Sequence, residues 1–71
     1  MEKWISKAVG KMHVERITQT ELAKELGIRR DYLNKILNGH EKPQGIRVRI
    51  EEALNRIVER KASNGETGLQ R

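Results

Sequence analysis

The sequence lacks cysteine, and it contains few aromatic residues and little proline. Without cysteine, neither a disulfide bond nor a thiolate zinc ligand is available to stabilise the fold. Phenylalanine is also absent, and Trp4 and Tyr32 are the only aromatic residues, so isoleucine and leucine must supply most of a buried core. No apolar run approaches the roughly 20 residues that a membrane-spanning helix needs. The first nine residues contain no continuous apolar stretch of the kind found in signal peptides. We therefore expect a cytoplasmic protein with no membrane partner.

Length and charge narrow the class of protein further. A chain of 71 residues predicts one small domain near the lower limit for a self-sufficient core, so dimerisation would add useful buried surface. It leaves no room for a second, ligand-sensing domain. The net charge of +5 favours a polyanionic partner, either nucleic acid or an anionic membrane surface.

Apolar spacing predicts an all-α fold of four helices. We expect helices over about residues 2–14, 19–26, 29 or 30 to 37, and 46–61, because apolar side chains recur there at helical intervals. Gly10 interrupts the first helix and lowers its propensity by roughly 1 kcal/mol, or else permits the close approach of another helix. We predict that residues 1–61 form the domain and that residues 62–71, which are rich in small and polar residues, are a disordered tail.

The second and third of these helices carry the clearest local signals. Thr18 and Glu21 have the spacing of a capping box, in which each side chain bonds the other residue's main-chain N–H. Gly27 fits a left-handed turn that ends the second helix. The small side chain of Ala23 suits a close helix crossing. Two short helices joined by a tight glycine turn are predicted, and the second helix of such a unit can enter the major groove of DNA.

The segment from Thr18 to Gly39 resembles the lambda-repressor-like, Cro/CI-type (XRE) helix-turn-helix regulators of phages and bacteria. The residues that carry this resemblance are Gln19, Leu22, Ala23, Leu26, Gly27, Ile28, Leu33, Ile36, Asn38 and Gly39. The resemblance implies a compact bundle of four or five helices that binds short palindromic operators as a dimer. The sequence departs from the family pattern at Arg29, where serine or threonine is usual, and in having one long helix in place of a separate fifth one.

Several residues of the third helix are candidates for reading base edges. Direct readout needs polar side chains on the exposed face near the start of the recognition helix. The candidate base contacts are Arg30, Asp31, Tyr32, Asn34 and Lys35. Arg30 and Lys35 suit guanine, while Asn34 suits adenine and Asp31 suits cytosine. Asp31 has two other options, which are to orient Arg30 or to pair with Lys35 one turn later.

A second set of residues is expected to contact the DNA backbone. In the family, the position of Gln19 bonds a phosphate at the N-terminus of a helix, where anions are favoured. Asn38 and the loop after Gly39 are expected to offer main-chain N–H groups. Arg47 and Arg49 open the last helix, where cations oppose the helix dipole, so a phosphate ligand is one explanation for them. The candidate phosphate contacts are Thr18, Gln19, Arg29, Asn38, His40, Lys42, Gln44 and Arg47.

Other chemistry has little support in the sequence. His13 and His40 have no second histidine or cysteine at metal-ligand spacing, so we expect no metal and no cofactor. No nucleophile with a base and no phosphate-binding glycine loop is present, so neither an enzyme nor a small-molecule substrate is expected. The leading interpretation is a dimeric repressor of duplex DNA, with the dimer surface near Ile57, Val58 and the end of the last helix. The alternatives are an antitoxin-like or partner-binding helical module and a basic scaffold for RNA or membranes.

Overall fold

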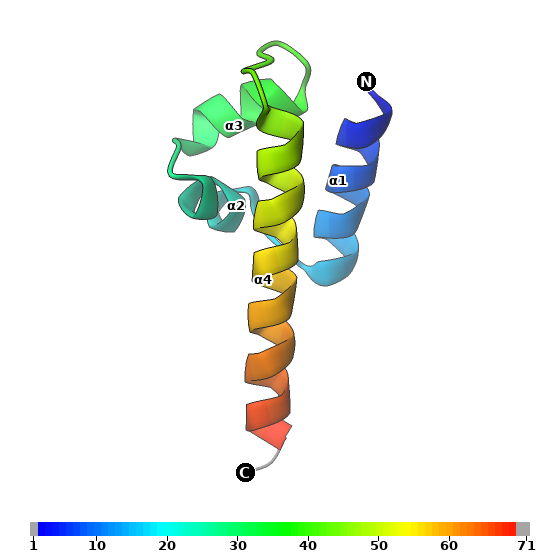
Figure 1. Cartoon of the computed structure of the whole chain (residues 1–71), viewed down its shortest axis with the longest axis vertical. Helices are drawn as coiled ribbons and strands as arrows, with labels where there is room; N and C mark the ends of the chain where they lie inside the picture. The colour runs from blue at the N-terminus through cyan, green and yellow to red at the C-terminus, as the bar shows by residue number, and fades with distance from the viewer. Residues whose placement is uncertain (1, 70–71) are drawn as a thin grey trace.

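Four helices make up the fold. The computed structural model describes the backbone of residues 2–69 and the side chains of residues 2–63. The helices are α1 (Lys3–Glu15), α2 (Gln19–Leu26), α3 (Arg30–Leu37) and α4 (Ile46–Leu69), and no strand occurs among the described residues. Helices α1 and α4 lie side by side and run in the same direction, while α2 and α3 lie on the other side of α4 (Figure 1). The expected all-α, four-helix fold is confirmed.

One apolar core joins all four helices. Leu22, Leu33 and Ile50 have no exposed surface, and each such side chain contributes about 1.5–3 kcal/mol by leaving water. Ile57 is only 3% exposed, so the expectation that it lies at a dimer surface is wrong. Val58 is partly buried against the same core. The apolar stripe of α4 is therefore used mainly inside the domain.

The start and end of α2 agree with the sequence prediction because both are set by local contacts. The Glu21 N–H donates to Thr18 Oγ1 at 3.0 Å, and the Thr18 N–H donates to Glu21 Oε1 at 3.0 Å. That second bond holds the pKa of the Glu21 carboxyl below its ordinary value. Gly27 has a φ of 74°, and its N–H and that of Ile28 donate back to the last turn of α2 in a Schellman motif. This turn sets the position from which α3 starts.

Helix α1 ends in a similar turn, although no glycine is present. Arg16 adopts the left-handed conformation at a φ of 58°, and the Ile17 N–H donates to the Met12 carbonyl at 2.8 Å. Within α1, Gly10 is exposed, and a Cβ built on it would meet no atom within 4 Å. The alternative in which Gly10 permits the close approach of another helix of this chain is therefore wrong.

Helix α4 continues beyond the end that the sequence predicts. The expected end was near Lys61, but the helix includes Ala62 and Ser63. At the expected end, Lys61 is held by residues outside the helix, since its Nζ donates to the Arg16 carbonyl at 2.9 Å and lies 3.4 Å from the Glu21 carboxylate. Of the expected disordered tail, the side chains of residues 64–69 and the whole of residues 70–71 lie outside the described part of the chain.

Candidate nucleic-acid interface

Helix α3 divides into a buried face and a polar, exposed face. Leu33, Ile36 and Leu37 are in the core. The opposite side of the helix is exposed, and its side chains line one shallow hollow on the molecular surface. These four side chains are Arg30, Asp31, Asn34 and Lys35. The structure therefore leaves four of the five expected base-contact residues together on one surface, and Tyr32, which is 37% exposed, lies at its edge.

The first turn of α3 is held by a charged pair instead of a hydroxyl cap. Arg29 occupies the N-cap position, with a φ of −78° and a ψ of 150°, and its side chain makes no capping hydrogen bond. Its Nε lies 3.4 Å from Asp31 Oδ1, and both side chains are largely exposed. Asp31 thus pairs with Arg29 and with neither of the two partners that the sequence suggested. An exposed pair of this kind is worth about 0–1 kcal/mol, so DNA can replace it at small cost.

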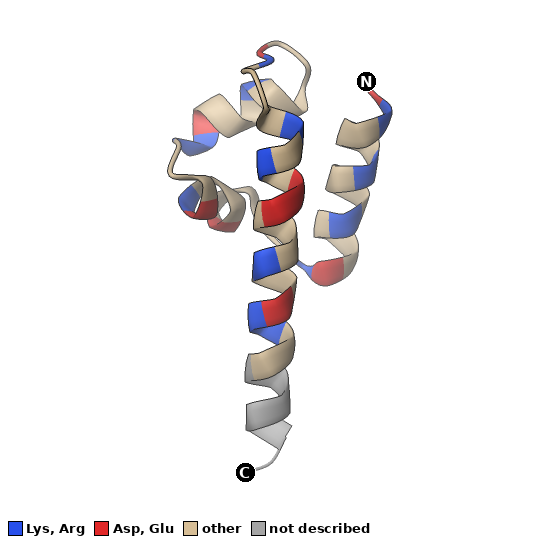
Figure 2. Cartoon of the chain, viewed as in Figure 1, with Lys and Arg blue, Asp and Glu red and all other residues tan. Residues whose placement is uncertain are grey.

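Arg30 and Lys35 are the free cations of this surface. Neither side chain makes a hydrogen bond or ion pair with another part of the chain that the structure describes. By contrast, Arg56 and Arg60 of α4 bind the Glu25 carboxylate at 2.8 and 2.7 Å. The hydrogen bonds from Arg60 and then Arg56 hold the pKa of Glu25 below its ordinary value. Figure 2 shows Lys and Arg on all four helices, so net charge alone does not locate a DNA-binding face.

A chain of amide side chains connects α3 to the first residue of α2. Asn38 Nδ2 donates to the main-chain carbonyl of Asn34 at 2.9 Å and to Asn34 Oδ1 at 2.5 Å. Asn34 Nδ2 in turn donates to Gln19 Oε1 at 3.3 Å. This connection was not predicted from the sequence. The spacing of four between Asn34 and Asn38 was a usable signal, but nothing local indicated Gln19.

The loop after α3 has fewer unbonded main-chain N–H groups than the sequence predicts. The N–H groups of residues 38–41 all donate back to carbonyls of α3, at distances from 2.8 to 3.3 Å. These bonds close the C-terminus of α3, where Gly39 has a φ of 81°. The expectation that Asn38 and the first loop residues offer main-chain N–H groups to phosphates is therefore not supported by this geometry.

Some of the side chains expected to contact phosphate are bound to carboxylates of the chain, and others are not. Lys42 Nζ lies 2.8 Å from the Glu2 carboxylate, and this contact is the largest cause of the lowered pKa of Glu2. Arg47 Nε lies 3.2 Å from the Glu51 carboxylate one turn later. Both pairs are substantially exposed, so each cation can leave its carboxylate and bind another anion. The remaining two candidates of this segment, His40 and Gln44, are exposed.

Arg49 has a structural partner that explains its unfavourable place at the start of α4. Its Nη2 donates to the carbonyl of Leu26 at 3.1 Å, in a partly buried contact. Leu26 is the last residue of α2, so the guanidinium sits at the negative end of that helix dipole. The cation therefore stabilises the C-terminus of a neighbouring helix, and a phosphate is not required to account for it.

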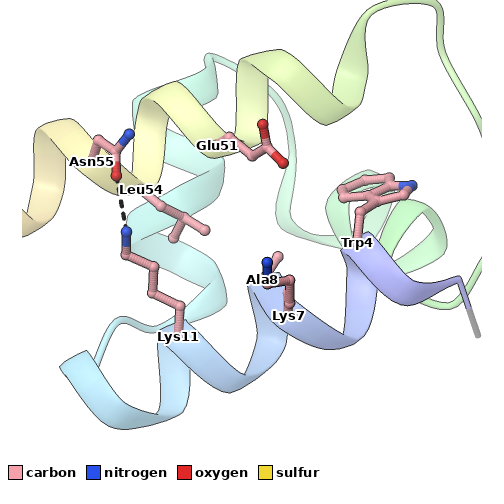
Figure 3. Close-up of a pocket in the computed structure, with 7 residues that line it drawn as sticks. All are labelled: Trp4, Lys7, Ala8, Lys11, Glu51, Leu54 and Asn55. Carbon is pink, nitrogen blue, oxygen red and sulfur yellow. Dashed lines mark hydrogen bonds between the residues drawn. The ribbon is translucent and has the colours of Figure 1, made fainter.

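A groove between α1 and α4 is the other recess of interest among the described residues. It has a volume of about 380 Å³, and its side chains come from the facing sides of these two helices (Figure 3). The lining residues are Trp4, Lys7, Ala8, Lys11, Glu51, Leu54 and Asn55. Lys11 Nζ donates to Asn55 Oδ1 at 2.9 Å and partly closes it. No residue of α2 or α3 lines this groove, so it is separate from the polar face of α3.

Two short helices joined by a glycine turn, with the second helix presenting a polar face, define a helix-turn-helix DNA-binding domain. The helix-turn-helix family model matches residues 15–56, which include α2, α3 and the first part of α4. The chain belongs to this XRE, lambda-repressor-like helix-turn-helix family of DNA-binding regulators. Membership implies that double-stranded DNA is its ligand.

The other comparisons add no relatives. No curated protein and no solved structure matches the chain. Among the described helices, none combines the length and the apolar character that crossing a membrane requires.

Proposed function

We propose that the protein is a sequence-specific transcriptional repressor that places α3 in the major groove of duplex DNA. The observation that carries the proposal is the exposed polar face of α3, on which Arg30 and Lys35 have no partner within the described chain. Unpaired cations on a recognition helix can reach base edges without first breaking an ion pair. Membership of a DNA-binding family supports the same conclusion.

Base readout is assigned to the N-terminal two turns of α3. Arg30 and Lys35 would donate to O6 and N7 of guanine, the commonest specific contact in the major groove. Asp31 would leave Arg29 and accept from N4 of cytosine, and Tyr32 would flank these contacts. Each good contact of this kind discriminates against a wrong base by about 1–3 kcal/mol.

Backbone contacts would surround this face and fix its register. Gln19 and Thr18 lie at the N-terminus of α2, where the helix dipole favours a phosphate. The other proposed phosphate contacts are Arg29, His40, Lys42, Gln44 and Arg47. Such contacts position the protein and give most of the salt-dependent affinity, but they carry no sequence information directly.

Binding as a homodimer follows from how little DNA one copy can read. A single α3 reaches only a few base pairs, whereas specific sites are longer and often palindromic. Two copies would occupy half-sites about one helical turn, roughly 34 Å, apart. We propose that the protein regulates by occluding a promoter in the cytoplasm, as small phage- or bacterial-type repressors do. Sedimentation that finds only monomer, both at high concentration and on DNA, would contradict the dimer.

The test compares alanine variants of the two surfaces on selected and random duplexes. A preferred duplex is first selected from a random library with the unaltered protein. Arg30→Ala and Lys35→Ala should then each weaken binding to it by roughly 5- to 150-fold and change binding to random DNA much less. Gln19→Ala should weaken both alike.

The matched control for this test is Lys7→Ala. It removes one positive charge from α1, which lies across α4 from α2 and α3, and should leave the preference unchanged (Figure 1). If Arg30→Ala and Lys35→Ala weaken binding equally on both DNAs, α3 does not read bases. Failure of the unaltered protein to bind any duplex, together with co-purification of a protein partner, would favour the partner-binding alternative.

A further inference from the structure

Three amide side chains form a chain of hydrogen bonds across the proposed DNA-binding face. We call Asn38, Asn34 and Gln19 the amide relay. We propose that this relay fixes the Gln19 side chain with its NH₂ group turned outward to a DNA phosphate, and that Asn34 is a positioning residue and not a reader of adenine. The inference rests on the proposed function: it refines the phosphate contact of Gln19 and replaces the adenine contact that the sequence suggested for Asn34.

The orientation of the relay follows from its fixed end. A main-chain carbonyl can only accept, so the Asn38 atom that lies 2.9 Å from the Asn34 carbonyl must be its Nδ2. The same nitrogen reaches the side chain of Asn34, which must therefore present Oδ1 to it. The Asn34 Nδ2 then faces Gln19, whose near atom must be Oε1. One backbone carbonyl thus orders all three amides.

The Gln19 side chain is left with one polar atom that has no partner. Its Oε1 accepts from Asn34 at 3.3 Å, while Nε2 makes no hydrogen bond within the described chain. An amide NH₂ group is a donor only, which suits a phosphate oxygen and repels no negative charge. If the relay were broken, the Gln19 amide could rotate and turn Oε1 toward the phosphate. Oε1 and the phosphate oxygens are all acceptors, so no hydrogen bond would form. Asn38 therefore affects the DNA contact through two intervening hydrogen bonds.

The same contacts hold the Asn34 side chain against the protein surface. Bidentate pairing with adenine uses Oδ1 and Nδ2 of one amide together. In Asn34, Oδ1 already accepts from Asn38, which follows the last residue of α3, and Nδ2 already donates to Gln19 of α2. Base readout is then left to Arg30, Asp31 and Lys35.

The test measures affinity, base preference and phosphate dependence in the same variants. Asn34→Ala and Asn38→Ala should each weaken binding by roughly 3- to 10-fold on selected and random duplexes alike. In a Gln19→Ala background, Asn34→Ala should cause no further loss, because the three residues act as one unit. Asn55→Ala, which removes an equally exposed amide in the α1–α4 groove, is the control and should have no effect.

Two readouts separate positioning from a merely structural role. Site selection with Asn34→Ala should return the same consensus as the unaltered protein. Replacing single phosphates by neutral methylphosphonates should identify one position per half-site whose effect disappears in Asn34→Ala and in Gln19→Ala. Thermal unfolding of each variant shows whether it is folded, and alanine at position 34 suits the interior of a helix.

The outcomes distinguish this inference from the proposed function. If the unaltered protein selects a consensus and Asn34→Ala changes the preferred base at one position, Asn34 reads that base and the inference is overturned while the function stands. Additive losses from Gln19→Ala and Asn34→Ala would also overturn it. If the unaltered protein selects no consensus, both the proposed function and the inference fail.

Discussion

Two neighbouring arginines of α4 should affect different properties of the protein. Arg49 binds the Leu26 carbonyl at 3.1 Å, whereas Arg47 makes an exposed pair with Glu51 at 3.2 Å. We expect Arg49→Ala to lower stability and leave DNA affinity intact. We expect Arg47→Ala to do the reverse. The two substitutions remove the same charge two residues apart on one helix, so each is the control for the other.

The size of the Arg49 effect follows from its contact. A hydrogen bond from a charged group contributes about 1.5–3 kcal/mol net, and a cation at a helix C-terminus contributes roughly 0.3–1 kcal/mol. The contact is only partly buried, which reduces both figures. The substitution also removes a cation from the N-terminus of α4, where positive charge is unfavourable, and this offsets part of the loss. A net loss of about 1 kcal/mol remains, which would lower the Tm of a domain of this size by about 4–8 °C.

The measurement combines thermal unfolding with a duplex-binding titration at one salt concentration. Affinities are compared well below the Tm of each variant, so that every variant is folded. If Arg49→Ala leaves the Tm unchanged but weakens binding as Arg47→Ala does, Arg49 is a phosphate ligand. The role of its bond to α2 would then be refuted.

Three further predictions concern stability. Gly10→Ala should raise the free energy of unfolding by about 0.5–1 kcal/mol in a urea titration, because the position is helical and open, and no gain would mean that α1 is frayed there. Gly27→Ala should lower it by about 1–2 kcal/mol, because the φ of 74° penalises a Cβ even where there is space, and an unchanged midpoint would contradict the left-handed turn. Arg60 and Arg56 lower the pKa of Glu25 from its ordinary value of 4.5, so their stabilisation is complete above that pH and is lost as pH falls through the lowered pKa. Glu25→Gln should therefore flatten the acid side of a plot of stability against pH, and an unaltered slope would show that this carboxylate is unpaired in solution.

The sequence predicted those features that depend on neighbouring residues. The ends of α2 were predictable because Thr18 and Glu21 bond each other at one end and Gly27 forms the turn at the other. The polar face of α3 was predictable because its buried residues recur at helical spacing. Both signals lie within a few residues of the structure that they determine.

Contacts between distant residues were not predictable in this way. The partner of Arg49 is 23 residues away, and Asn34 and Gln19 are separated by 15 positions. No spacing rule indicates which carbonyl or amide will lie opposite once the helices pack. For this reason the sequence suggested a phosphate as one explanation for Arg49 and gave no sign that the Asn34 amide bonds Gln19. The contacts of Lys61 with Arg16 and Glu21, far back in the chain, were equally invisible in the sequence.

The most direct test of the proposed function asks whether α3 lies in the major groove of bound DNA. The chain contains no cysteine, so a single introduced cysteine can carry a DNA-cleaving iron chelate at a chosen position. Tyr32→Cys at the edge of the α3 face should cleave the selected duplex within each half-site, with the strand offset typical of the major groove. The control Glu59→Cys, on the exposed side of α4, should cleave weakly or not at all. Stronger cleavage from position 59 than from position 32 would contradict the placement of α3 on DNA.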